Sequence, residues 1–157
     1  MKFSDDAYDV NENLILAIFF GIICAIASAM AAINDVGAAY IFIGILMGNL
    51  IALKIDGVHH LITLIIFILI CLICGLPDLN ILILLITIFA ALTDEIGHEL
   101  ISNVTQNEFL ILFFEYRFVM KIVIFLLALF GVLSFWTFLL FILFEMSYLV
   151  AGWLYKK

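Results

Sequence analysis

The chain has 157 residues, of which 68% are hydrophobic and 12% are charged. Its mean hydropathy of +1.38 lies far above that of soluble domains, in which roughly half of the residues are apolar. This composition predicts an integral membrane protein and excludes an ordinary soluble domain. The formal net charge of −7, with only six basic residues, argues against a nucleic-acid partner, because phosphates require a basic surface.

Whole runs of the sequence are apolar at nearly every position, as in residues 61–74 and 122–130. Strands of a membrane barrel would alternate apolar and polar residues, so these runs predict helices and an all-α fold. A helix needs about 20 residues to cross a bilayer. Six stretches approach that length: 14–33, 38–55, 58–75, 81–101, 109–131 and 135–155. We therefore expect a polytopic membrane helix bundle of about six transmembrane helices, with residues 1–157 forming a single integral membrane domain.

Basic residues predict the orientation of this bundle in the membrane. With six spans, both termini lie on one side, together with the segments 54–60 and 93–108. That side receives four lysines: Lys2, Lys54, Lys156 and Lys157. The opposite turns, near Asp35, Asp78 and Ser134, contain no basic residue. The positive-inside rule therefore predicts that both termini are cytoplasmic.

Small residues recur every four positions in the first two spans, which allows another helix to approach closely. In the first span they are Ala17, Gly21, Ala25 and Ala29, and in the second they are Gly44, Gly48 and Ala52. These ridges predict helix-packing seams, and we expect the first two spans to form a tight hairpin.

The pattern DxxxH occurs twice, as Asp56 with His60 and as Asp94 with His98. In a helix this spacing places both side chains on one face, one turn apart. Each copy follows two apolar spans joined by a turn that contains an aspartate, so the sequence indicates a repeated helical hairpin. Ionisable residues within membrane helices are costly, and their presence is typical of a functional site.

Two facing helices that each contribute an aspartate and a histidine would supply four ligands to one metal ion, as in carboxylate-rich helical bundles. We therefore predict Asp56, His60, Asp94 and His98 as metal ligands. Imidazole and carboxylate together favour a divalent transition metal such as Zn, Fe or Mn. Alternatively, these side chains lie at the membrane surface and are solvated by water and lipid headgroups.

Three further charged residues lie close to this polar pool in the sequence. Glu95 and Glu99 are one turn apart and are candidates for additional ligands or for the general base that activates a metal-bound water. Arg117 is a candidate for binding a substrate phosphate, because guanidinium groups pair with phosphate through two hydrogen bonds.

Residues 95–100, EIGHEL, resemble the metal-site helix of ZIP-type zinc and iron transporters, in which a His, Glu, Pro, His, Glu pattern carries ligands. Asp94 stands where that family has its first His, and Gly97 stands where it has Pro. The resemblance covers only residues 94–100, and the family uses more than six spans. It implies metal ligation by the fourth span.

Two charged residues fall inside the last two spans. In an antiparallel pair that turns near Leu133, Lys121 and Glu145 lie at the same depth. Each offers the other a partner that hydrocarbon cannot provide, so we predict an ion pair between them. Such a pair either joins the two helices or takes part in a proton or cation relay.

Three functions remain open from the sequence. The first is a membrane-embedded, metal-dependent enzyme that acts on a lipid or isoprenoid substrate, favoured by a polar pool at the membrane surface. The second is a divalent metal cation transporter, favoured by the ZIP-like segment and by the charges in mid-membrane. The third is a non-catalytic membrane subunit whose polar residues bind a partner.

Overall fold

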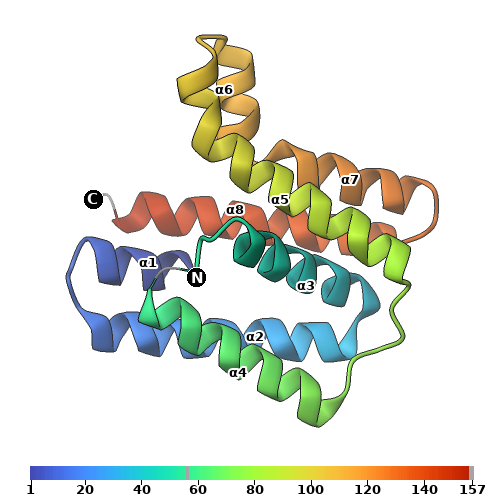
Figure 1. The fold of residues 1–157 in the computed structure, drawn as a ribbon. Coiled ribbons are helices and arrows are strands. Elements are labelled where there is room, and N and C mark those ends of the chain that lie inside the picture. Colours follow the sequence, from blue (N-terminus) through green and yellow to red (C-terminus); the bar gives the residue numbers. More distant parts are fainter. Residues whose placement is uncertain (56, 156–157) are drawn as a thin grey trace.

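The computed structural model describes residues 1–55 and 57–155, and these residues are all-α (Figure 1). They form eight helices: α1 (Lys2–Asp9), α2 (Leu14–Asn34), α3 (Val36–Ile51), α4 (Val58–Cys74), α5 (Ile81–Val104), α6 (Glu108–Glu115), α7 (Phe118–Leu129) and α8 (Phe135–Tyr155). The predicted all-α class is confirmed. Asp56, one of the predicted ligands, lies outside the described residues.

Polar residues start four of these helices where the sequence changes from polar to apolar. Asn13, Asp35, Asn80 and Asn107 are the N-cap residues of α2, α3, α5 and α6, and each side chain accepts a hydrogen bond from a backbone N–H of the first turn. Each cap satisfies an amide that has no partner within its helix. The caps therefore fix where these apolar helices begin.

Three helices are long and apolar enough to cross a membrane: α2 over Leu14–Asn34, α5 over Ile81–Ile101 and α8 over Phe135–Leu154. The other three apolar helices, α3, α4 and α7, have 16, 17 and 12 residues. A helix of 12 residues extends about 18 Å, which is less than the bilayer hydrocarbon thickness of about 30 Å. Among its described residues, the chain thus has fewer full-length spans than the six predicted.

Two interruptions shorten the predicted spans. α3 ends at Ile51, and Leu53 then adopts a left-handed backbone conformation with a φ of 58°. The predicted fifth span is broken at Tyr116 and Arg117, which separate α6 from α7. Arg117 has a φ of 51°, a costly value for a residue other than glycine.

The helices α2 and α3 are joined by a tight turn and contact each other, and each of them packs on one of the next two helices (Figure 1). α2 packs on α4, and α3 packs on α5. Gly21 in the ridge of α2 faces Thr63 of α4, and Gly48 of α3 lies against Ala91 of α5. At these positions the predicted packing seams join α2 to α4 and α3 to α5. α2 also contacts α3, as expected for a hairpin of the first two spans.

Two charged side chains satisfy the backbone groups at the break between α6 and α7. The Asp94 carboxylate of α5 accepts hydrogen bonds from the N–H groups of Val119 (3.0 Å) and Met120 (2.7 Å) at the start of α7. The Lys121 ammonium donates to the carbonyl oxygens of the two residues at the break. A break inside an apolar bundle is tolerated only where the freed backbone groups are paired.

Lys121 also forms the predicted ion pair with Glu145 of α8, with 2.9 Å between Nζ and Oε2. The two side chains are 15% and 17% exposed. The expectation that they lie at the same depth in an antiparallel pair is therefore confirmed.

α1 is a helix that the sequence analysis does not predict. It folds back along the first turns of α2 and also contacts α8 (Figure 1). Ser4 Oγ donates to the carbonyl oxygen of Ala17 at 2.7 Å, and Lys2 pairs with Asp6 at 2.7 Å. The Ser4 bond ties this short polar helix to α2, and the Lys2–Asp6 pair lies within the helix itself.

The arrangement of the helices leads to a test of topology. The end of α3, the start of α4 and the end of α8 lie at one end of the bundle, and the α2–α3, α4–α5 and α7–α8 turns lie at the other (Figure 1). We expect a cysteine at Asn34 to react with a membrane-impermeant maleimide added outside intact cells, and a cysteine at Val10 to be protected. Both positions are exposed. The measurement uses a variant without the native cysteines, and the reverse labelling pattern would invert the orientation.

The buried ion pair leads to a second test. Lys121→Met and Glu145→Gln should each cost about 2 to 4 kcal/mol of unfolding free energy, because each leaves a charge without its partner in an apolar environment. The double variant should lose less than the sum of the two single losses, since no unpaired charge then remains. Equilibrium unfolding in detergent measures all three losses. Additive losses would show that the two charges are not coupled.

Candidate metal centre

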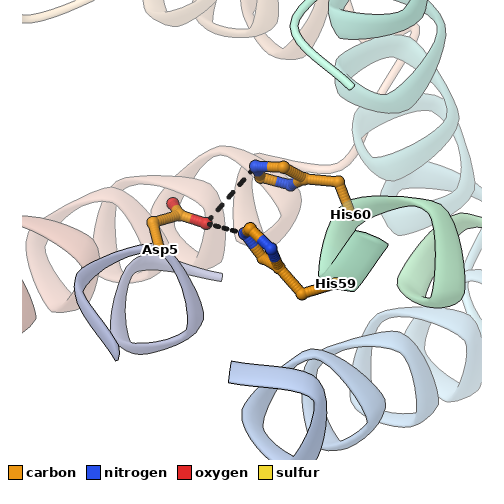
Figure 2. Close-up of side chains that lie close together, drawn as sticks. All are labelled: Asp5, His59 and His60. Atoms are coloured by element: carbon orange, nitrogen blue, oxygen red, sulfur yellow. Dashed lines mark ion pairs between the residues drawn. The ribbon is translucent and has the colours of Figure 1, made fainter. Parts of the chain in front are cut away.

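Three side chains with metal-binding atoms meet at one end of the bundle (Figure 2). Asp5 comes from α1, and His59 and His60 come from the first turn of α4. Asp5 Oδ1 lies 3.6 Å from His59 Nε2 and 3.7 Å from His60 Nε2. Among the described residues, one ligand atom from each of the three lies within 4.8 Å of the others.

These distances fit a shared cation better than direct hydrogen bonds. A separation of 3.6 Å is too long for a normal N–H···O bond. Ligand atoms placed tetrahedrally around zinc at 2.0–2.2 Å lie about 3.4 Å apart. The two distances from Asp5 Oδ1 are therefore within a few tenths of an ångström of those expected around one bound ion.

Two of the three residues contain buried atoms that have no hydrogen-bond partner among the described residues. These atoms are Asp5 Oδ1 and both ring nitrogens of His59, a residue that is 2% exposed. Burying polar atoms without a partner is costly, and a bound cation would remove that cost for the two atoms that face each other. The donor set thus fits a divalent transition metal.

The electrostatics of Asp5 agree with this interpretation. Burial raises the pKa of the Asp5 carboxyl group to about 6, although the N-terminal amine, His59 and Lys2 lower it. The neighbouring positive charges therefore do not fully offset the hydration that the carboxylate loses. A divalent cation at this position would supply the missing charge.

Local packing fixes the orientation of the histidines. The ring of Tyr8 lies over the His59 ring, with 4.7 Å between the ring centroids, and the two histidine rings are 4.2 Å apart. Gly57, the N-cap of α4, lies directly against the His59 ring, where a Cβ would come within 2.4 Å of Cε1. A larger residue at position 57 would displace His59.

A cavity of about 380 Å³ extends from this group into the bundle. Its charged lining consists of four acidic and two basic side chains: Asp5, Asp94, Glu95, Glu145, Lys54 and Arg117. Phenylalanines from α3, α4 and α8 form much of its apolar wall. The cavity therefore combines an acidic end with an apolar interior.

Both basic side chains of the lining are paired with carboxylates. Arg117 Nη2 lies 2.9 Å from Glu95 Oε1, and Glu95 is largely buried. Lys54 Nζ lies 2.8 Å from Oε2 of Glu99, whose side chain is 58% exposed. The predicted catalytic residues Glu95, Glu99 and Arg117 thus take part in ion pairs, and an anionic substrate would have to compete with a carboxylate.

The predicted metal ligands are distributed differently from the expectation. His60 belongs to the group with Asp5 and His59, while Asp94 and His98 line the cavity outside that group. Both carboxylate oxygens of Asp94 already accept hydrogen bonds from the start of α7. The two DxxxH copies also occupy different places, because His60 lies in the first turn of α4 and His98 lies well inside α5.

The segment that resembles the ZIP-type metal helix has a packing role at its centre. Gly97 lies against Phe114 of α6, and a Cβ at position 97 would come within 2.0 Å of the ring. The glycine that replaces proline in this segment therefore allows α6 to pack closely on α5.

Sequence reasoning missed Asp5 and did not assign a ligand role to His59. Asp5 belongs to a short polar segment ahead of the first apolar run, and nothing in its spacing indicates that this segment folds back against α4. The adjacent histidines His59 and His60 were the only signal, since two imidazoles in the first turn of a helix can share a ligand from another element.

Comparisons of the chain with protein-family models, with curated proteins and with solved structures find no match.

Proposed function

We propose that this protein is a multi-pass membrane protein that binds a divalent transition-metal ion at Asp5, His59 and His60 and transports such ions across the membrane. The observation that carries the proposal is the position of this His/Asp group at an acidic cavity inside an apolar bundle. Imidazole and carboxylate ligands favour Zn, Fe or Mn over Ca or Mg.

The charges around the cavity support a cation as the transported species. Four carboxylates and two basic side chains line it, and Arg117 and Lys54 are both paired. Asp94, Glu95 and Glu145 have partners within the chain, so a cation that enters gains electrostatic stabilisation mainly from Asp5. Three protein ligands leave coordination positions open, so the ion can exchange with water and leave the site.

In this proposal six helices cross the membrane and both termini are cytoplasmic. The shorter helices α3, α4 and α7 lie beside the long helices α2, α5 and α8, which supports their placement within the same membrane layer. A bilayer adapts to short spans by thinning locally at a modest energetic cost.

A metal-dependent enzyme acting on a lipid or isoprenoid substrate is the second candidate. It is favoured by the phenylalanine-rich wall of the cavity, which suits an acyl or prenyl chain. A metal held by Asp5, His59 and His60 would supply a Lewis acid for the hydrolysis of such a substrate. Glu95 and Glu99 are less suited to accept a proton in that reaction, because each is paired with a basic side chain.

Metal content of the purified protein tests the ligand set. We expect the wild-type protein to retain Zn, Fe or Mn after dialysis, and His59→Ala and His60→Ala to lose most of it, because each removes one of three ligands. His98→Ala changes the remaining histidine of the chain and should retain the metal. Inductively coupled plasma mass spectrometry of all four proteins gives the result. Loss of metal in His60→Ala and His98→Ala, with metal retained in His59→Ala, would instead support the ligand set predicted from the sequence.

Flux through reconstituted vesicles separates the transporter from the enzyme. Proteoliposomes with a metal-sensitive dye inside should show saturable uptake of Zn²⁺ or Mn²⁺, and His60→Ala should abolish it. Phe89→Ala, on the exposed face of α5, should leave uptake unchanged. A wild-type protein that binds metal but gives no uptake would contradict transport and favour the enzyme.

A further inference from the structure

A second cavity of about 200 Å³ lies toward the opposite end of the bundle. Its polar lining comes from Asp35, at the start of α3, and from Thr137, in the first turn of α8. A carboxylate and a hydroxyl oxygen are groups that can contact a cation.

Three phenylalanines line both cavities at once. They are Phe42 of α3 and Phe141 and Phe144 of α8. The rings of Phe42 and Phe144 are 5.5 Å apart and nearly perpendicular, and Phe141 is only 3% exposed. The two cavities are therefore separated by a layer of aromatic side chains.

We infer that the two cavities are the halves of one cation pathway and that Phe42, Phe141 and Phe144 form its gate. This inference rests on the proposed transport function. Apolar constrictions stop hydrated ions because the ion would have to shed its water without receiving replacement ligands. The structure thus corresponds to a closed gate, with the His/Asp group on one side and Asp35 on the other.

The gate lies between α3 and α8, which are in contact over a small area. Their contacts include the rings of Phe42 and Phe144, and Gly37 against Thr137. A rotamer change of Phe42 or Phe144, or a small separation of the two helices, would join the cavities. Such movements are ordinary for side chains and helices on the nanosecond to millisecond scale. No break in the backbone hydrogen bonding of α3 or α8 is required.

Side-specific cysteine labelling tests the gate without relying on transport. In a variant without native cysteines, Ser28→Cys reports on the first cavity and Ala38→Cys reports on the second. A small membrane-impermeant thiol reagent should reach each position from one side only, and the two sides should be opposite. Adding Phe42→Ala should allow the reagent to reach Ala38→Cys from both sides. Phe89→Ala is the matched control and should leave the sidedness unchanged.

Two results would overturn the gate. One is labelling of Ala38→Cys from both sides with Phe42 intact, which would show that the aromatic layer is no barrier. The other is unchanged sidedness in the Phe42→Ala variant, which would place the barrier elsewhere. Neither result depends on metal binding. If the two positions are labelled from opposite sides and Phe42→Ala removes that difference, the gate is supported even if metal uptake fails. The pathway would then carry a different solute.

Discussion

The carboxylate of Asp94 holds together the part of the bundle on which the cavity depends. In an apolar environment the amides at the start of α7 have no water to bind, and Asp94 supplies both acceptors, at 3.0 and 2.7 Å. The carboxylate also suits the positive end of the helix dipole. Because these two amides have acceptors, the helix can break at Arg117. The Arg117 guanidinium then pairs with Glu95 at the cavity wall.

The acidic residues of the bundle therefore divide into two groups by what they contact. Asp94, Glu95 and Glu145 each have a partner within the chain: backbone amides, Arg117 and Lys121. Asp5 lies beyond hydrogen-bonding distance of both histidine nitrogens, and its Oδ1 has no hydrogen-bond partner in the described part of the chain. A buried charge is tolerated when a partner of opposite charge or a hydrogen-bond donor compensates it. For Asp5, a bound ion would be that partner. This difference is why we propose Asp5 and the two histidines as the metal ligands.

The sequence predicts contacts that follow from regular geometry and misses those that depend on irregular segments. The pairing of Lys121 with Glu145 requires only a tight antiparallel turn, so equal depth could be read from the residue numbers. His60, Asp94 and His98 line one cavity, but the contact of His60 with Asp5 depends on a segment outside the apolar helices. The fold-back of α1 depends on single bonds such as that from Ser4 to Ala17, and a short polar segment carries no periodicity that reveals them.

The position of Asp5 on α1 has a consequence for how the cavity can work. The two histidines belong to α4, whereas Asp5 belongs to a helix of eight residues held by contacts to α2 and α8. An ion bound by all three side chains would cross-link α1 to α4 beside the first cavity, which the phenylalanine layer also lines. The proposed ligands lie on α1 and α4, whereas the phenylalanine layer lies on α3 and α8. α8 also contacts α1 and carries Phe141 and Phe144. α8 is therefore an element through which binding at the His/Asp group can influence the gate by direct contact.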